Sequence, residues 1–302
     1  MYEIRARNVG AVHARPGKLH WRAGEPARTS DLAPSTPGVF EFSHLTKRGL
    51  LDNITAVPKT LLAGLATLIY PPRCPYCHKS IPDYPTGKLC PRCLLLIEFN
   101  RPPFCVKCSR HMGERANSLY CKECVKFNPA FDFAWGACLY NDILKTLLFA
   151  FKYHQKTYLR NQLATFMIRF IEEYQLDIRQ FDVIVPVPLA GVKERERGYN
   201  QAELLAQNVA KHFNMNIFTN KILRIRNTQS QTLLSQKERW TNTQGAFRIN
   251  HSSTFKSKSV LIIDDLLTTG ATAAAVAGVL KEHKAKTVGV LTLGIAHTNE
   301  NY

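Results

Sequence analysis

From Asp132 onward, short runs of apolar and β-branched residues alternate with longer segments whose apolar positions recur every three or four residues. The short runs predict strands, and they cover residues 134–140, 183–187, 260–263 and 287–293. The longer segments predict amphipathic helices, and they cover residues 143–153, 159–174, 201–213 and 271–284. This alternation predicts an α/β fold, with an open, mainly parallel sheet and helices on both faces.

The first part of the chain follows a different pattern. Residues 1 to about 55 hold scattered Pro, Gly, Arg and Ser without periodicity, which predicts a poorly ordered extension. Residues 60–70 predict a short helix that ends at Pro71-Pro72. A cysteine-rich module follows up to residue 129, and residues 130–302 form the α/β domain. The apolar segment 60–70 falls well short of the roughly 20 residues that a membrane span needs, so no membrane insertion is expected.

Eight of the nine cysteines form Cys-x2-Cys pairs, namely Cys74 and Cys77, Cys90 and Cys93, Cys105 and Cys108, and Cys121 and Cys124. Each cysteine of the second four lies 31 positions after its counterpart in the first four, which indicates an internal repeat of two zinc ribbons. Two such pairs complete a closed tetrahedral site, so we expect two structural zinc ions. An iron–sulfur cluster, four disulfides and a cross-brace pairing are the alternatives. The ninth cysteine, Cys138, is expected to be free and buried.

The formal net charge is +17, and two four-thiolate zinc sites would lower it to about +13. Such an excess suits a polyanionic ligand, nucleic acid or simple solubility, so charge alone does not choose among them. Paired cysteines without a recognisable secretory signal indicate metal binding in a reducing compartment, and we expect a cytoplasmic protein.

Polar residues follow the predicted strand 260–263 in the string VLIIDDLLTTGAT. A strand-to-helix turn is where open α/β sheets bind ligands. We expect Asp264 and Asp265 to accept hydrogen bonds from ribose hydroxyls, and the turn to hold a phosphate. The turn residues are Thr268, Thr269, Gly270, Ala271 and Thr272. The alternative is that the aspartates cap the following helix and that Thr-Thr-Gly is ordinary turn chemistry. The whole string resembles the phosphoribosyl pyrophosphate (PRPP) signature of type I phosphoribosyltransferases.

A second polar segment follows the predicted strand 183–187. It contains Pro188 and Leu189, then Lys193, Arg195 and Arg197 interleaved with two glutamates. Arginine forks match pyrophosphate oxygens, although a solvated helix start with internally paired charges is the alternative. Parallel strands end on one edge of a sheet, so we expect this turn to face the same crevice as Asp264.

A third segment, residues 223–247, is polar and long enough to close over a ligand. For Arg224 and Arg226, a role in a lid and a place in a surface loop followed by a short helix are equally compatible with the sequence. For Gly245, Ala246 and Phe247 we expect a structural role.

Together these motifs resemble the ComF family of competence-associated proteins, in which a double zinc ribbon precedes a phosphoribosyltransferase domain. The resemblance runs from about Leu61 to Ala296 and rests on PPRCPYC, PVPLAGVKERERGYNQA, RIRNTQSQTLLSQKERWTNTQGAF and VLIIDDLLTTGAT. Relatives commonly have proline where Ser230 precedes Gln231. The resemblance implies PRPP bound with Mg²⁺: the 5-phosphate on residues 268–272, the ribose on Asp264 and Asp265, and the pyrophosphate near the second segment. Arg224 is also expected to bind PRPP.

Two functions follow from the resemblance. The first is an enzyme that uses Asp264 and Asp265 in transferring phosphoribose to a nitrogenous acceptor. The second is a non-catalytic PRPP sensor or scaffold for DNA uptake that binds single-stranded DNA or a helicase-type partner. The sequence is compatible with a homo-oligomer but does not determine the oligomeric state. For DNA, the ribbons offer cations and aromatic rings, namely Lys79, Lys88, Arg92, Arg110, Lys122, Tyr76, Tyr84, Phe104 and Tyr120. Core packing explains these aromatic residues equally well.

Overall fold

The computed structural model describes residues 73–81, 88–113, 117–226, 236–250 and 252–296. The predicted extension 1–55, the predicted helix 60–70 and the Ser230-Gln231 part of the third segment lie outside the described residues.

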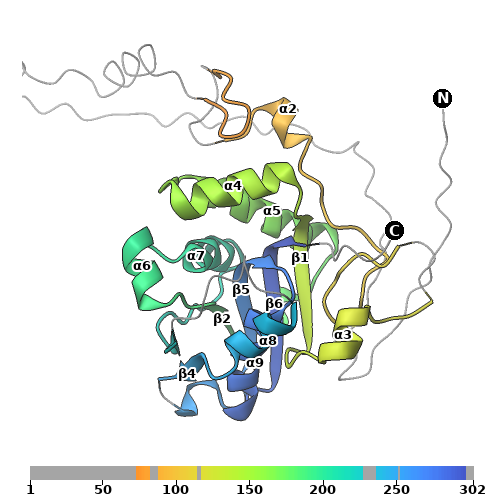
Figure 1. Ribbon diagram of the computed structural model, residues 1–302, viewed down its shortest axis with the longest axis vertical. Helices are drawn as coiled ribbons and strands as arrows, with labels where there is room; N and C mark the ends of the chain where they lie inside the picture. Colours follow the sequence, from red (N-terminus) through yellow and green to blue (C-terminus); the bar gives the residue numbers. More distant parts are fainter. Residues whose placement is uncertain (1–72, 82–87, 114–116, 227–235, 251, 297–302) are drawn as a thin grey trace, which may run out of the picture.

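A four-stranded parallel sheet forms the centre of the α/β domain (Figure 1). Its strands are β1 (Phe133–Leu139), β2 (Val183–Pro186), β5 (Ser259–Leu267) and β6 (Thr287–Ile295), in the order β1-β6-β5-β2. All four predicted strands and the parallel fold are confirmed. Strand β5 is longer than predicted, because its pairing with β6 continues through Leu266 opposite Gly294 and Leu267 opposite Ile295.

Helices cover both faces of this sheet, as predicted. They are α4 (Asp142–Tyr153), α5 (Leu159–Glu173), α7 (Gln201–Phe213) and α9 (Ala271–Glu282). Residues of β5 alternate between the two faces: Leu261 and Ile263 lie in the core formed with α4, α5 and α7, and Val260 and Ile262 lie in the core formed with α9. The four apolar residues in a row are explained by burial on both faces.

Asparagine caps fix where two of these helices begin. The Asn141 side chain accepts a hydrogen bond from the Leu144 backbone N–H at 3.2 Å, at the start of α4. The Asn200 side chain accepts from Ala202 N–H at 3.0 Å at the start of α7, and its amide donates to the Val187 carbonyl at 3.0 Å. Asn200 therefore ties the start of α7 to the end of β2 as well as satisfying an otherwise unpaired helical N–H.

Several short elements were not predicted as such. They are α6 (Gly191–Arg197), α8 (Gln236–Thr243), the antiparallel pair β3 (Ile222–Arg224) and β4 (Phe247–Ile249), and the 3-10 turns Ile178–Gln180 and Ser252–Phe255. Helix α6 is the helix start that is the alternative for the second segment, and α8 is the short helix that is the alternative for the third. Residues 245–247 lead into β4, in agreement with their expected structural role.

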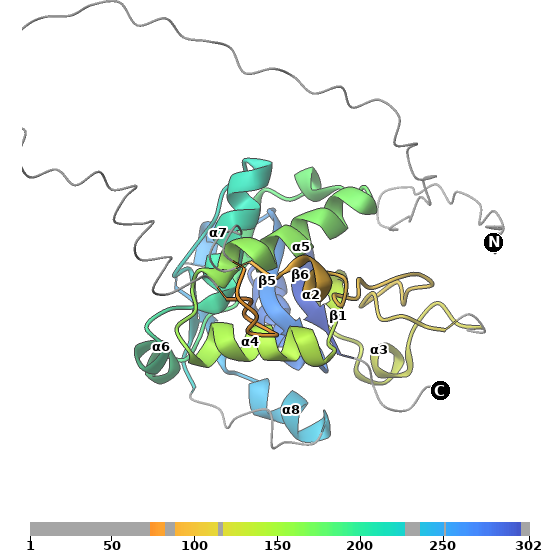
Figure 2. The same cartoon turned by 90° about the horizontal axis from the view of Figure 1, so that it is seen from above.

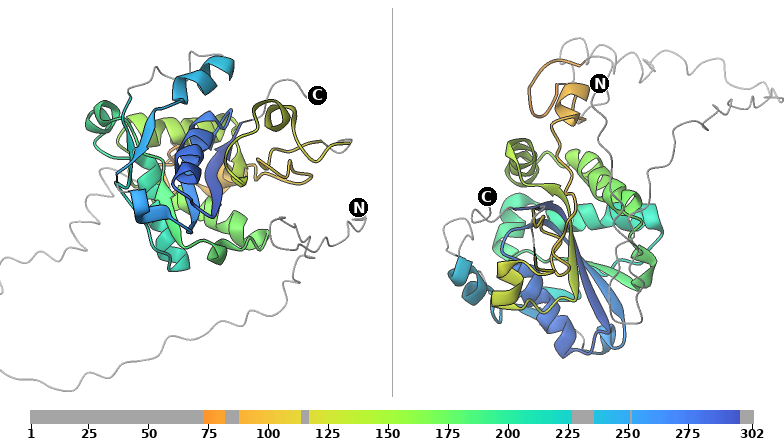
Figure 3. Two further views of the ribbon diagram at one scale, coloured as in Figure 1. Left: turned by 90° about the horizontal axis from the view of Figure 1, so that it is seen from below. Right: turned by 90° about the vertical axis from the view of Figure 1, so that its right-hand side faces the viewer.

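The cysteine module repeats in structure as it does in sequence. The backbone N–H of Cys74 donates to the Lys79 carbonyl at 2.9 Å, and the N–H of Cys105 donates to the Arg110 carbonyl at 2.8 Å, 31 positions later. The second cysteine pair of each ribbon opens a short helix, α2 (Pro91–Leu94) or α3 (Lys122–Phe127). The first ribbon lies beside α4, as Figure 2 shows from above, and α3 of the second ribbon lies near α8 (Figure 3).

Among the residues that the structure describes, no helix combines the length and the apolar character needed to cross a membrane.

Candidate functional site

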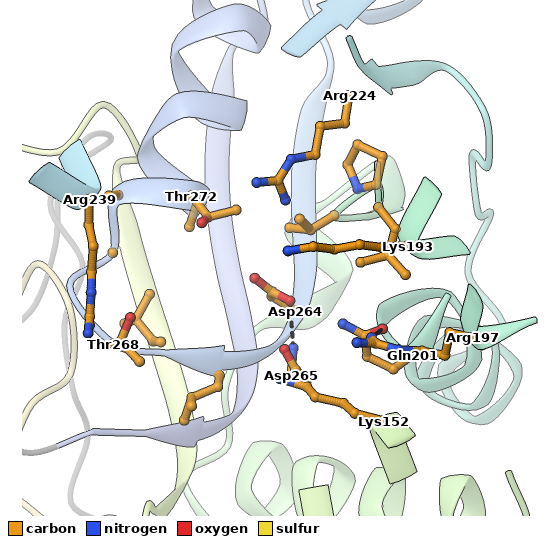
Figure 4. A pocket seen from close by; sticks show the side chains of 18 of the residues that line it. Lys152, Lys193, Arg197, Gln201, Arg224, Arg239, Asp264, Asp265, Thr268 and Thr272 are labelled. Carbon is orange, nitrogen blue, oxygen red and sulfur yellow. Dashed lines mark hydrogen bonds and ion pairs between the residues drawn. The ribbon is translucent and has the colours of Figure 1, made fainter. Parts of the chain in front are cut away.

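A cavity of about 440 Å³ lies where β2 and β5 end, beside the first turn of α9 (Figure 4). Its size is within the range of small-molecule sites. The first and second polar segments both line it, so the expectation that they face one crevice is confirmed by their position. Of the third segment, Arg224 and Arg239 line the cavity.

Asp264 and Asp265 lie within strand β5, not in the turn after it. This corrects the expected placement, and the reason is the longer pairing of β5 with β6. Successive residues of a strand point to opposite faces, so the two carboxylates leave the strand in different directions. In Figure 4 the Asp265 side chain extends toward Lys152, whereas Asp264 lies toward Lys193 and Arg224. The Asp265 backbone N–H also donates to the Asp264 carboxylate at 2.8 Å.

Asp265 is paired with Lys152 of α4, a residue that the sequence reasoning missed. The Lys152 side chain is 21% exposed and the Asp265 side chain 6% exposed. Burial opposes ionisation of Asp265, but the charge of Lys152 and its hydrogen bond outweigh that effect and hold the pKa of Asp265 below its ordinary value. Asp265 is therefore ionised. The sequence does indicate that Lys152 faces inward, because it lies four residues after Leu148 and eight after Leu144, which are buried positions on the same face of α4.

Asp264 has the opposite electrostatic character. Burial raises its pKa well above the ordinary value, and the neighbouring negative charge of Asp265 adds to the increase. Asp264 lines the cavity without an ion pair in the described part of the chain. A partly buried carboxylate of this kind is stabilised by a cation or by hydrogen-bond donors that a ligand brings.

The turn between β5 and α9 has the features of an anion site. Thr268, Gly270, Ala271 and Thr272 line the cavity, and Gly270 has a positive φ of 83°. Glycine adopts this conformation without steric cost. Thr269 does not line the cavity. It is buried, and its hydroxyl accepts a hydrogen bond from the Ala271 N–H at 3.3 Å, so it holds the start of α9.

Helix α6 divides the cations of the second segment between two faces. Lys193 and Arg197, four residues apart, line the cavity together with Pro188 and Leu189 of the preceding turn. Arg195 is exposed to solvent and is not among the cavity residues. Burial lowers the pKa of Lys193, and the nearby charges of Arg224 and Arg197 lower it further. Arg197 is held at the cavity by donating to the Gln201 side-chain oxygen and by lying over the Tyr153 ring, 5.3 Å from its centroid.

The third segment contributes Arg224 of β3 and Arg239 of α8 to the cavity. Burial lowers the pKa of Arg224, while the charge of Asp264 acts in the opposite direction. Arg226 is exposed, and it donates to the Gln244 carbonyl at 2.9 Å. The cavity therefore combines five cationic side chains with two carboxylates, which favours a polyanionic ligand that also carries hydroxyl groups. The cations are Lys152, Lys193, Arg197, Arg224 and Arg239.

The eight paired cysteines gather into two groups of four whose sulfur atoms all lie within 4.8 Å of one another. The groups are Cys74, Cys77, Cys90 and Cys93, and Cys105, Cys108, Cys121 and Cys124. This is the sequential pairing and not the cross-brace. Sulfur atoms 3.8 Å apart in Cys77 and Cys90, and 3.6 Å apart in Cys108 and Cys121, match the edge of about 3.8 Å of a tetrahedron with 2.3 Å Zn–S bonds. Both groups fit structural zinc. Cys138 is fully buried outside them, as expected, and burial raises the pKa of its thiol.

Comparison with known proteins agrees with this architecture. Residues 65–125 match the double zinc ribbon domain, and residues 154–298 match the phosphoribosyl transferase domain. Competence protein F of Haemophilus influenzae is 28% identical over 215 residues, which cover 70% of this chain and 91% of that protein. The DNA utilization protein YhgH of Salmonella typhimurium is 27% identical over 219 residues, covering 68% of this chain and 96% of that protein. Competence protein ComFC of Bacillus subtilis is 32% identical over 156 residues, which cover 51% of this chain and 60% of that protein.

Proposed function

The chain belongs to the ComF family, with a double zinc ribbon and a phosphoribosyltransferase domain, and from this premise we propose that it binds PRPP and transfers its phosphoribosyl group to a nitrogenous acceptor. The observation that carries the proposal is the cavity beside the start of α9, which is lined by five cations and two aspartates. PRPP carries a phosphate, a pyrophosphate and two ribose hydroxyls, and each of these groups has chemically matching residues there.

Each end of the ligand is assigned to one side of the cavity. The 5-phosphate lies on the turn of Thr268, Gly270 and Thr272, where the first backbone N–H groups of α9 and the helix dipole favour negative charge. The pyrophosphate lies near Lys193 and Arg197 on the other side. The ribose hydroxyls then fall between these groups, where the Asp264 and Asp265 carboxylates accept their hydrogen bonds.

In the reaction, the bond between the anomeric carbon and pyrophosphate breaks, and the electron pair leaves with pyrophosphate. A bond forms from the acceptor nitrogen to that carbon, and the acceptor loses a proton to solvent. Lys193 and Arg197 stabilise the negative charge that develops on the leaving group, and the two aspartates stabilise the positive charge on the ribose. The Asp264 carboxylate offers the kind of oxygen ligand that Mg²⁺ accepts beside phosphate oxygens, and the ion would neutralise part of the leaving-group charge.

The names of the relatives suggest the process that this activity serves. They are called competence proteins and DNA utilization proteins, so we place the chain in DNA uptake or use. Four-thiolate zinc sites persist in a reducing compartment, which supports a cytoplasmic location.

The test is incubation of the protein with PRPP, Mg²⁺ and a panel of nucleobases and other nitrogenous acceptors, with release of pyrophosphate as the measurement. The proposal predicts release that depends on one class of acceptor and is lost in Asp264→Asn. Arg195→Gln, which changes an exposed cation of α6 outside the cavity, is the matched control and keeps the activity. Binding of PRPP without release across the panel would reject the enzyme and favour a PRPP sensor or scaffold.

A further inference from the structure

Arg110 of the second zinc ribbon, one of the ribbon cations that the sequence offers for DNA binding, is buried, with 6% of its surface exposed. Its guanidinium Nε donates to the Ala296 carbonyl at 3.2 Å, and Nη2 donates to the Thr268 carbonyl. On the other side, Nη1 lies 4.0 Å from the Cys108 sulfur and 3.8 Å from the Glu123 carboxylate. One side chain thus joins the second cysteine cluster to the turn that lines the cavity.

These contacts need the planar, five-donor fork of arginine. Two of its nitrogens donate to carbonyls of the α/β domain, while the third faces a sulfur ligand and a carboxylate of the ribbon. An ammonium group is a point charge and cannot make this set of contacts at once. A zinc ion bound by the four thiolates would give the site a net charge of minus two, which would offset the cost of burying the guanidinium beside Cys108.

The repeat supplies an internal comparison. Lys79 of the first ribbon is the counterpart of Arg110, because both residues offer their backbone carbonyl to the first cysteine of their ribbon. Lys79 is exposed. The ribbon fold therefore does not require a buried cation at this position, and the burial of Arg110 must reflect its contacts with the α/β domain.

The two carbonyls that Arg110 reaches lie where β5 and β6 end. Ala296 N–H donates to the Leu267 carbonyl at 2.9 Å, so Thr268 begins the turn directly after this last sheet contact. The same ribbon also contacts α8: the Phe127 ring of α3 stacks on the Trp240 ring of α8, with centroids 4.8 Å apart and planes at 9°. Trp240 is next to Arg239, which lines the cavity.

We propose that Arg110 is a positioning residue that couples the second zinc site to ligand binding, by holding the Thr268 carbonyl so that the 268–272 turn is preformed. The first zinc site has no such connection through Lys79. The effect on PRPP rests on the proposed function, whereas the effect on the turn itself does not.

The first experiment is hydrogen exchange of the full-length, zinc-loaded protein without ligand. In Arg110→Ala, the turn amides that the structure shows hydrogen-bonded, Ala271 to the Thr269 hydroxyl and Ala274 to the Gly270 carbonyl, should exchange between about tenfold and 100-fold faster, the range expected when hydrogen bonds from a charged donor are lost. Lys79→Ala, the matched control, should leave them unchanged. Unchanged exchange in an Arg110→Ala protein that retains two zinc ions would overturn the proposal. If Arg110→Ala loses zinc, Arg110→Lys decides, since it keeps the charge beside the thiolates. Faster exchange of the turn would then support the coupling, and wild-type exchange would reject it.

The second experiment measures PRPP affinity by calorimetry in the same variants. Arg110→Ala should weaken binding by at least about tenfold, whereas Lys79→Ala should bind as the wild type does. Equal affinity in all three proteins would reject the link to ligand binding. If the wild-type protein binds no PRPP, the proposed function fails, and the exchange experiment still decides whether Arg110 positions the turn.

Discussion

The adjacent aspartates of β5 should have opposite effects on stability when each is changed to asparagine. Asp265→Asn leaves Lys152 without its ion-pair partner, and the two side chains are only 6% and 21% exposed. Removing one partner of a buried pair costs about 3 kcal/mol or more. At about 2–4 °C per kcal/mol for a domain of this size, the melting temperature should fall by roughly 6–12 °C.

Asp264→Asn should instead raise the melting temperature of the ligand-free protein near pH 7. Burial and the charge of Asp265 raise the pKa of Asp264, so its ionised form is unfavourable in the folded state. A group with a raised folded-state pKa stabilises the fold fully below its unfolded-state pKa of about 3.9, and this stability is lost as pH rises through the folded-state pKa. The stability advantage of Asp264→Asn over the wild type should therefore grow as pH rises above about 4.

The assay is thermal unfolding of zinc-loaded, ligand-free protein from acidic to neutral pH, with zinc content checked at each pH. A double-mutant cycle with Lys152→Met adds a control, because the double variant Lys152→Met/Asp265→Asn has no unpaired charge. It should be less destabilised than the sum of the single variants by about 0.5–3 kcal/mol. Equal destabilisation by Asp264→Asn and Asp265→Asn, or an additive cycle, would refute this account of the two carboxylates.

Three further predictions concern the ligand site and the ribbons. Arg197→Gln should weaken binding of inorganic pyrophosphate by about tenfold or more because Arg197 lines the cavity, whereas Arg195→Gln on the exposed face of the same helix should change it less than twofold; similar losses in calorimetry would contradict the assigned pyrophosphate site. Gly270→Ala should destabilise the protein by about 1 kcal/mol and weaken PRPP binding, because an L side chain is strained at a φ of 83°; wild-type values for both in unfolding and binding experiments would contradict it. Metal analysis should find two zinc ions per chain, and their removal by a chelator should lower the melting temperature because the closed sites are structural; a single ion, or iron, would contradict the double ribbon.

The sheet was predictable because its strands are short apolar runs buried on both faces, and such runs stand out between amphipathic helices. The antiparallel pair of β3 and β4 was not predicted, because strands of three residues are too short to show a period. The end of β5 was placed too early because carboxylates suggested a turn. Pairing with β6 as far as Ile295 overrides that local preference, and it could not be read from β5 alone.

In the site, too, the residues in local motifs could be predicted, whereas those positioned by contacts distant in sequence could not. Motif strings identified the segments that carry Asp264, Thr268 and Lys193. Lys152 and Arg110 were missed as parts of the site because isolated cations in a helix or a ribbon resemble solvent-exposed residues until their partners are known. Those partners lie more than 100 residues away in sequence, at Asp265 and Thr268. Helical spacing alone could have separated Lys193 and Arg197 from Arg195, since residues four apart share a face.

Calorimetric titration of the zinc-loaded protein with PRPP, with and without Mg²⁺, tests the proposed PRPP site most directly. We expect one site per chain and binding that depends on Mg²⁺. Asp264→Asn should lower the affinity at least about tenfold even though that variant melts at a higher temperature. No binding by the wild-type protein at millimolar PRPP with Mg²⁺ present would contradict the proposed site.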